Sequence, residues 1–260
     1  MDPFLTIVIP AYNESARLGA TLDRVLSFAD QFTSDVELIV VNDGSIDDTA
    51  EIVRRYASKR ENVRLLENPG NRGKGYSVRH GILEARGTVV LFTDADLSAP
   101  IEEAPKLLAA LGDGADIAIG SRWIRADLQT QRQSLARQVL GRAFNLFLRA
   151  LLRLDFKDTQ CGFKAFRRNA ARAIFPLQKI EGWGFDAEIL FLARQLGFKV
   201  TEVPVLWGHD ERTRINPVAD GARMLVEMMR IRWNSLTGVY GDRVRARSGA
   251  VLQQGEHPRT

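Results

Sequence analysis

Two aspartates follow a short apolar run at residues 91–96, which read Leu-Phe-Thr-Asp-Ala-Asp. Only Ala95 separates Asp94 from Asp96, and two like charges at such short range repel each other. A divalent cation would remove this repulsion, and carboxylate oxygens shared with substrate phosphates are ligands that suit Mg²⁺ or Mn²⁺. An acidic turn after a strand would give the same pattern, so the pair predicts a metal site only if neighbouring segments supply a substrate site.

Three further loops follow apolar runs and carry polar residues. They span residues 10–14, 42–49 and 68–75. Individually, Asp43-Gly44 could be a turn with a helix cap, and Glu14 could be a charge that complements a helix start. Together the loops offer carboxylates for a ribose or base and a glycine-rich basic segment for phosphate. The candidate residues are Pro10, Ala11, Asn13, Glu14, Asn42, Asp43, Lys74, Asp94, Ala95 and Asp96.

The elements that must position these loops alternate along the first half of the chain. Apolar runs predict strands at residues 5–9, 36–41, 63–66, 88–92 and 115–119, and helical spacing predicts helices at 15–28, 49–57 and 76–85. This alternation predicts an α/β fold with a parallel-dominated sheet and helices on both faces. Ligands of such sheets bind at the carboxyl ends of the strands, so all four loops should meet at one nucleotide-diphosphate site.

The second half has longer helical patterns. Helices are expected at residues 135–154, 186–195 and 217–236, and a strand at 198–205. We expect one domain over residues 1–241, with a nucleotide-sugar half at 1–119 and an acceptor half at 120–241, and a disordered basic tail at 242–260. In helix 217–236 we place Met224, Leu225, Met228 and Ile231 on one face. This face could lie on a membrane surface, pack against the sheet or form a homodimer seam.

Composition narrows the function classes. The chain has 260 residues, a net charge of +4 and one cysteine, Cys161, which excludes an internal disulfide and disfavours a zinc site. No basic patch interleaved with aromatic residues suggests nucleic acid as a partner. No signal peptide or membrane-spanning run is recognisable. We therefore expect a cytoplasmic protein, either free or attached peripherally to a membrane surface.

The motifs resemble a known family. Residues 9–14 (Ile-Pro-Ala-Tyr-Asn-Glu), 41–45 (Val-Asn-Asp-Gly-Ser), 71–75 (Asn-Arg-Gly-Lys-Gly) and 94–96 (Asp-Ala-Asp) resemble the signature of family 2 glycosyltransferases with the GT-A fold. Residues 120–122 (Gly-Ser-Arg), 158–164 (Asp-Thr-Gln-Cys-Gly-Phe-Lys), 183–188 and 202–207 are similar to dolichyl-phosphate β-glucosyltransferases and their bacterial polyprenyl-phosphate relatives. The similarity runs from about residue 5 to 241.

The resemblance implies roles for the donor-site residues. The loops that contain Pro10, Ala11, Asn13, Glu14, Asn42 and Asp43 would hold the nucleoside. Lys74 would lie near the base, ribose or diphosphate, Asp94 near the ribose or sugar, and Asp96 would bind the metal. Ser98 occupies a position where related mannosyl enzymes often carry Gln, so water or Ser98 would complete the metal shell.

The acceptor side has its own implied residues. Asp186 stands where sugar-transferring relatives place a general base, although a helix cap is the plain alternative. A phosphate acceptor has a second pKa of about 6 and needs no strong base, so Asp186 would rather orient the substrates. Bringing two anions together requires cations. Candidates to hold the acceptor phosphate are Arg122, Arg142, Arg212 and Arg214.

The resemblance thus implies an inverting transferase that moves a hexose from a nucleotide sugar, first of all UDP-glucose, to a polyprenyl phosphate on the inner face of the cell membrane. A GDP-mannose-dependent enzyme remains an alternative. A transferase acting on a sugar hydroxyl would instead use Asp186 as a true base. A nucleotide-binding module without catalysis belongs to a different class, and binding of UDP-sugar without turnover would identify it.

Overall fold

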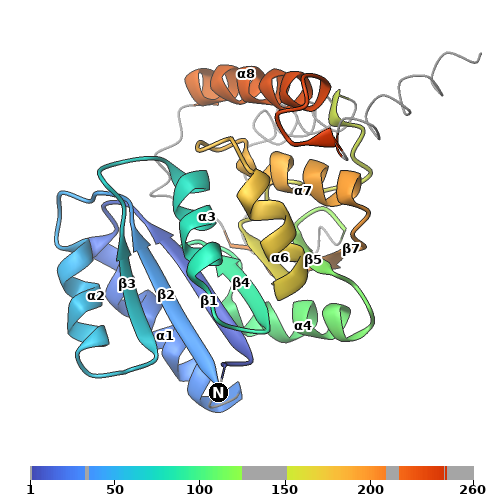
Figure 1. Ribbon diagram of the computed structural model, residues 1–260. Coiled ribbons are helices and arrows are strands. Elements are labelled where there is room, and N and C mark those ends of the chain that lie inside the picture. Colours follow the sequence, from blue (N-terminus) through green and yellow to red (C-terminus); the bar gives the residue numbers. More distant parts are fainter. Residues whose placement is uncertain (1, 33–34, 125–150, 209–216, 243, 245–260) are drawn as a thin grey trace, which may run out of the picture.

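Helices and strands alternate along the chain in the computed structural model, which describes residues 2–32, 35–124, 151–208, 217–242 and 244 (Figure 1). The strands are β1 (Leu5–Ala11), β2 (Val36–Asn42), β3 (Val63–Glu67), β4 (Val89–Thr93), β5 (Ile117–Ser121), β6 (Phe163–Arg167) and β7 (Val200–Pro204). The helices of the described residues are α1 (Ser15–Phe32), α2 (Thr49–Ala57), α3 (Lys74–Glu84), α4 (Ala104–Gly112), α6 (Arg168–Ile174), α7 (Phe185–Leu196) and α8 (Pro217–Leu236), with short 3₁₀ turns at Ile101–Glu103 and Phe175–Leu177.

All seven strands form one sheet in the order β3-β2-β1-β4-β6-β5-β7. The pairs β1–β2, β1–β4, β2–β3 and β5–β7 are parallel, whereas β6 runs antiparallel to both of its neighbours, β4 and β5. This sheet confirms the predicted fold class, including its mixed strand directions. Strands from both expected halves of the chain contribute to the same sheet.

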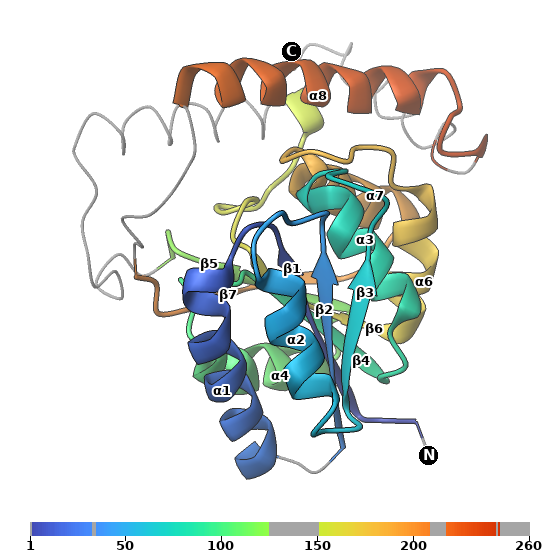
Figure 2. The same cartoon turned by 90° about the vertical axis from the view of Figure 1, so that its left-hand side faces the viewer.

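The sheet separates two apolar layers. Alternating side chains of β1 point to opposite faces, with Leu5, Ile7 and Ile9 in one cluster and Val8 in the other. Helices α1, α2 and α4 cover the first face, and α3, α6 and α7 cover the second (Figures 1 and 2). Because both faces are covered, the central strands read as continuous apolar runs, which made them predictable.

Three elements differ from the sequence prediction. The sequence patterns predict no helix or strand at α4, β6 or α6, all of which are present. Strand β6 cannot be predicted from apolar periodicity, because its second residue, Lys164, is charged and is nevertheless fully buried. The expected helix 135–154 lies outside the described residues except at its end, where 151–152 are helical, and the expected disordered tail at 242–260 falls almost entirely outside them.

Helix α8 has the predicted bounds and lies across the end of the molecule where β1, β2 and β4 end (Figures 1 and 2). The predicted apolar face is only partly right. Met228 and Ile231 are buried in the second cluster, but Leu225, at the margin of this face, is exposed. Among the described residues, no helix is long and apolar enough to cross a membrane.

Candidate donor and acceptor site

The antiparallel strand β6 brings the residues that precede it next to the aspartate pair. Thr93, the last residue of β4, pairs with Phe163, the first residue of β6. Gly162 therefore lies directly beside Asp94. A Cβ atom at Gly162 would stand 2.1 Å from Asp94 Oδ2, so this contact requires glycine. The pairing explains how a motif near residue 160 joins a site built from residues before 100.

The turn that holds the aspartates is fixed by hydrogen bonds. Leu97 donates its N–H to the Asp94 carbonyl (3.1 Å) and adopts a positive φ of 48°. Ser98 donates its N–H to Asp96 Oδ1 (2.9 Å), and the buried Thr21 hydroxyl donates to the Ala95 carbonyl (2.6 Å). The two carboxylates are thus held at the end of β4 and remain half-buried.

The charges at this turn suit a cation. Burial, together with the nearby Asp94 charge, raises the pKa of Asp96. Lys74 binds Asp94 Oδ1 at 2.5 Å and supplies one compensating charge. Two hard carboxylates whose repulsion is only partly relieved fit a divalent cation. The described residues contain no group of three His, Cys, Asp or Glu side chains that could hold a metal. Ser98 contacts Asp96 through its N–H and its side chain, and its carbonyl accepts the Gly208 N–H (2.8 Å).

Asp43 holds the glycine-rich loop in place. Its Oδ1 accepts hydrogen bonds from Asn68 Nδ2 (2.7 Å) and the Arg72 N–H (2.9 Å), and its Oδ2 accepts one from the Gly73 N–H (2.8 Å). Asp43 itself is buried at the end of β2. The structure therefore gives this carboxylate a positioning role for the loop that carries Lys74.

The loop is also held tightly from its other side. Gly73 has a φ of 102°, and a Cβ there would lie 2.5 Å from the Glu181 carbonyl. A Cβ at Gly75 would lie 2.7 Å from the Ile180 carbonyl. Between these glycines, Lys74 lies 5.2 Å from the centroid of the Trp183 ring. Close approach of residues 180–183 thus fixes the direction of Lys74.

The remaining predicted nucleoside residues build the neighbouring loops. Asn13 adopts a φ of 54°, accepts a hydrogen bond at Oδ1 from the Ile46 N–H (2.9 Å) and donates its own N–H to Ser45 Oγ (2.9 Å). Asn42 Oδ1 accepts from the Ser45 N–H (3.1 Å). Glu14 pairs with Arg17 at 2.7 Å. Pro10 and Ala11 end β1, and the Ala11 carbonyl accepts the Asp43 N–H (2.9 Å).

Arg122 lies at the end of β5 and is held by Asp158. Its Nε and one terminal nitrogen donate to the two Asp158 oxygens at 2.7 and 2.9 Å, and its backbone N–H donates at 3.0 Å. Although burial works against ionisation, the Arg122 charge lowers the pKa of Asp158. The Asp158 N–H in turn donates to Glu202 of β7 (2.8 Å), and the guanidinium lies 5.4 Å from the Trp207 ring centroid.

Asp186 forms a buried ion pair with Lys164. Both side chains are almost fully buried, and Lys164 Nζ also donates to the Cys161 carbonyl (2.6 Å). Burial raises the pKa of Asp186, while the nearby charges of Lys164 and Lys74 oppose this shift. The helix-cap alternative for Asp186 is wrong, because the cap position of α7 belongs to Gly184. One of its carboxylate oxygens is already engaged by the Lys164 ammonium group.

Sequence reasoning missed the partners of these residues. Asp158, Gly162 and Lys164 lie in a motif that was recognised, but its contacts with Arg122, Asp94 and Asp186 were not. A lysine within an apolar run was the signal available for Lys164. The other candidate phosphate ligands, Arg142, Arg212 and Arg214, lie outside the described residues.

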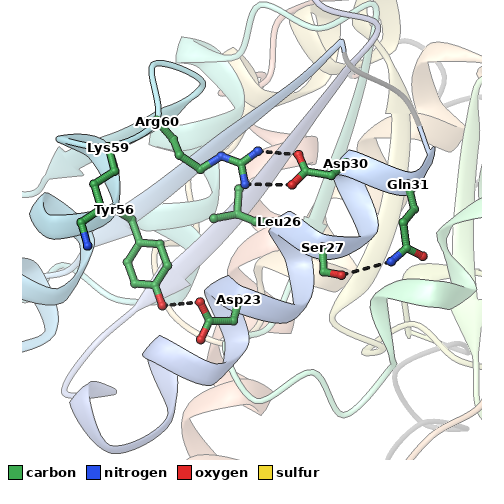
Figure 3. Close-up of a pocket in the computed structure, with 8 residues that line it drawn as sticks. All are labelled: Asp23, Leu26, Ser27, Asp30, Gln31, Tyr56, Lys59 and Arg60. Atoms are coloured by element: carbon green, nitrogen blue, oxygen red, sulfur yellow. Dashed lines mark hydrogen bonds and ion pairs between the residues drawn. The ribbon is translucent and has the colours of Figure 1, made fainter.

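A separate hollow of about 430 Å³ lies between α1 and α2 (Figure 3). Its residues come from the second half of α1, from the end of α2 and from Lys59 and Arg60 just after α2. The hollow therefore lies toward the amino-terminal ends of the strands, away from the aspartate pair. Polar groups that line it pair with one another: Arg60 pairs with Asp30, and the Tyr56 hydroxyl donates to Asp23 (2.6 Å). This hollow therefore does not belong to the candidate site.

The sheet order, with an aspartate pair at the end of β4 and one antiparallel strand beside it, defines an α/β protein of the GT-A type. The chain belongs to glycosyl transferase family 2, whose family model matches residues 6–175.

Similar proteins agree with this assignment. A "Dolichyl-phosphate beta-glucosyltransferase" from Dictyostelium discoideum is 36% identical over 91% of this chain and 76% of its own length. A protein of the same name from Saccharomyces cerevisiae is 34% identical over 92% of this chain and 77% of its own length. Glucosyl-3-phosphoglycerate synthase from Mycobacterium tuberculosis, solved with Mn²⁺, UDP and glucosyl-3-phosphoglycerate, has a TM-score of 0.65 and 21% identity over 87% of this chain and 78% of that one, which supports the fold.

Proposed function

We propose that this chain transfers glucose from UDP-glucose to a polyprenyl phosphate, with inversion at the anomeric carbon. The observation that carries the proposal is the contact between Gly162 and Asp94, which joins the motif at 158–164 to the aspartate pair. That motif resembles the corresponding segment of enzymes that glycosylate a polyprenyl phosphate. The names of the relatives support glucose as the sugar and a dolichyl phosphate as the acceptor.

The donor side lies within residues 1–119 and the acceptor side within 120–241. The solved neighbour bound to Mn²⁺ and UDP supports a divalent metal and a nucleotide-sugar donor. In this proposal loops 10–14 and 42–49 form the nucleoside pocket, and Lys74 approaches the diphosphate. A divalent cation, Mg²⁺ or Mn²⁺, held by Asp94 and Asp96 would neutralise the charge that develops on the departing nucleoside diphosphate.

The acceptor phosphate is a dianion for most molecules at neutral pH, since its second pKa is about 6. One of its oxygens attacks the anomeric carbon as the bond to the diphosphate breaks, and UDP leaves with the bonding electrons. No proton has to be removed, which agrees with an Asp186 that is paired with Lys164. Arg122, held in place by Asp158, directs the acceptor phosphate. Asp186 orients the sugar or its neighbours.

A donor screen tests this function. The protein is incubated with Mg²⁺ or Mn²⁺, a short-chain polyprenyl phosphate and one nucleotide sugar at a time, and release of nucleoside diphosphate is measured against a control without acceptor. We expect acceptor-dependent release with UDP-glucose. Release with GDP-mannose alone would contradict the donor assignment. Release with an acceptor that offers a sugar hydroxyl, but not with the lipid phosphate, would contradict the acceptor assignment. Asp186 would then be expected to act as a general base.

A lipid-linked acceptor places the reaction at a membrane. We therefore propose that the protein works peripherally on the cytoplasmic face of the cell membrane.

A further inference from the structure

Helix α8 exposes an unusual apolar strip. Its inward side buries Met228 and Ile231, as expected for a surface helix. Its outward side should then be polar, but Val226 and Trp233 are 60% and 68% exposed. The whole strip, called the outer strip of α8 below, consists of Leu225, Val226, Met229, Trp233 and Leu236.

The members of the outer strip form one continuous surface. Leu225, Met229, Trp233 and Leu236 follow at intervals of four, four and three residues, which keeps them on the same side of an α-helix. Scattered apolar side chains are ordinary on a protein surface, but a contiguous row of them marks an interaction site. Val239, in the turn after α8, is also exposed.

Arginines border the strip on both sides. By helical geometry, the exposed Arg223 and Arg230 lie along one margin and the half-buried Arg232 lies along the other. Burial and the nearby charge of Arg153 lower the pKa of Arg232.

This combination fits a lipid–water interface. Apolar side chains enter the acyl region, tryptophan prefers the interface, and arginine side chains reach back to the lipid phosphates. Basic residues at the surface also gain attraction from the anionic lipids of a cytoplasmic leaflet. A second copy of this chain would bring like-charged arginine margins together and is less well matched.

The inner side of α8 is connected to the candidate site. Glu227 accepts the Gly184 N–H at 2.7 Å, and a Cβ at Gly182 would lie 2.3 Å from Glu227 Oε1. Residues 180–182 in turn contact Gly73 and Gly75 on either side of Lys74. Helix α8 is therefore fixed relative to the loop that carries Lys74, at the end of the sheet where the aspartate pair lies (Figures 1 and 2).

We propose that the outer strip of α8, with Arg223, Arg230 and Arg232, is a docking surface for an anionic lipid bilayer. The helix lies along the interface, with the strip among the acyl chains and the arginines at the phosphates. This orientation turns the carboxyl end of the sheet toward the bilayer. The inference extends the proposed function, because a lipid-linked acceptor would enter from that side, but docking itself requires no catalysis.

Vesicle binding by the full chain tests the surface. Phosphatidylcholine vesicles with and without phosphatidylglycerol are sedimented with the wild type and with a Val226→Asp, Trp233→Ser double variant, whose sites are exposed and should leave the fold intact. Leu83→Ser on α3, another exposed apolar position, is the matched control. We expect salt-sensitive binding of the wild type and of Leu83→Ser to the anionic vesicles. Binding of the double variant should be at least about tenfold weaker.

Two results would overturn the proposal. One is a wild type that does not bind anionic vesicles, or a double variant that binds them equally well. The other is a dimeric wild type and a monomeric double variant that bind vesicles equally. The outer strip of α8 would then be a contact between two copies of this chain.

Turnover of a detergent-solubilised short polyprenyl phosphate separates this proposal from the proposed function. Strip-dependent vesicle binding without any turnover would uphold docking and reject the function. Turnover that both proteins retain in detergent, but that the double variant loses on vesicles carrying the acceptor, would support both.

Discussion

Asp158 binds Arg122 through both of its carboxylate oxygens. They accept hydrogen bonds from Nε and a terminal nitrogen of Arg122 at 2.7 and 2.9 Å. This pairing of two planar groups depends on the guanidinium shape, which lysine cannot reproduce. Because Asp158 is buried, Arg122→Lys leaves its carboxylate poorly satisfied. We expect Arg122→Lys to lower the free energy of unfolding by about 2 kcal/mol and to reduce turnover while UDP binding persists.

The chain offers a matched control for that variant. Arg24 and Glu102 make the same two-bond contact, both at 2.8 Å, but on the exposed surface. Arg24→Lys should cost less than about 1 kcal/mol and leave turnover unchanged. Urea unfolding and UDP-release assays measure both variants. Equal effects of the two substitutions would contradict the special position of Arg122.

Gly162 has no room for a side chain. Gly162→Ala would force its methyl group into the Asp94 carboxylate, from which a Cβ would be only 2.1 Å away. We expect turnover to fall by at least about a hundredfold, as when a group that stabilises the transition state is displaced. The control is Gly19→Ala in α1, where no atom lies within 4 Å of the added Cβ. That change should stabilise the helix by about 0.5–1 kcal/mol and keep full activity.

Asp43→Asn should loosen the glycine-rich loop. The wild-type carboxylate accepts three hydrogen bonds, from Asn68, Arg72 and Gly73, whereas an amide nitrogen in place of one oxygen would face a donor. We expect a loss of about 1–3 kcal/mol in stability and a raised KM for the donor. Thermal unfolding with and without UDP checks this, since UDP should protect the variant less than the wild type. Unchanged protection by UDP would contradict the role of Asp43.

Metal removal tests the aspartate pair. Treatment with EDTA should abolish turnover, and Mn²⁺ or Mg²⁺ should restore it. Asp96→Asn should remain nearly inactive at saturating metal, with stability little changed, because the substitution removes a like charge beside Asp94. Isothermal titration of Mn²⁺ in the presence of UDP measures the expected loss of binding. Full activity of Asp96→Asn would reject Asp96 as a metal ligand.

Glu188 predicts a pH dependence of stability. Burial raises its pKa, although the Tyr240 hydroxyl (2.5 Å) and the N–H groups of Lys179 and Ile180 oppose the shift. A carboxyl whose pKa is higher in the folded state binds more protons there, so its contribution to stability falls as pH rises from about 4.3, the unfolded value, through the raised pKa. Urea unfolding of wild type and Glu188→Gln across this range gives the difference.

The difference in free energy of unfolding, wild type minus variant, should decline as pH rises and then become constant. Tyr240→Phe removes one hydrogen bond that favours the charged form, so it should move the decline to higher pH. If this difference in free energy of unfolding increased with pH, the pKa of Glu188 would be lowered in the folded state. The hydrogen bonds to its carboxylate would then have a larger effect on the pKa than burial.

Three loops of the candidate site were predictable because they follow β1, β2 and β4, apolar strands that are buried on both faces. The loop at 68–75 follows the edge strand β3, which is only partly buried. Helix 49–57 and helix 217–236 had the predicted bounds for a similar reason, since their apolar spacing is regular. Strand β6 could not be found in this way. Its buried Lys164 is neutralised by Asp186, and such a partner on another element leaves no trace in local spacing.

The site residues show the same division. The residue types of Asp94, Asp96 and Lys74 indicated what chemistry they could do. Which residues lie next to them depends on the order of strands in the sheet, which local sequence does not give. Arg122 was expected as a phosphate ligand, yet its pairing with Asp158 follows from the position of β5 next to β6. The side of α8 that faces the sheet was likewise decided by packing, because both of its sides carry apolar residues.

The position of β6 also constrains how this protein is made. Strands β1 to β4 are synthesised first, and β4 then has a neighbour only on the β1 side until residues 163–167 leave the ribosome. For that interval the nascent chain carries an uncovered apolar strand edge, a feature that promotes aggregation. A chain that stops before Phe163 keeps the edge open permanently, and its Asp94 lacks the backbone of Gly162 beside it. The aspartate pair therefore gains its neighbouring backbone only from a strand that arrives late in synthesis.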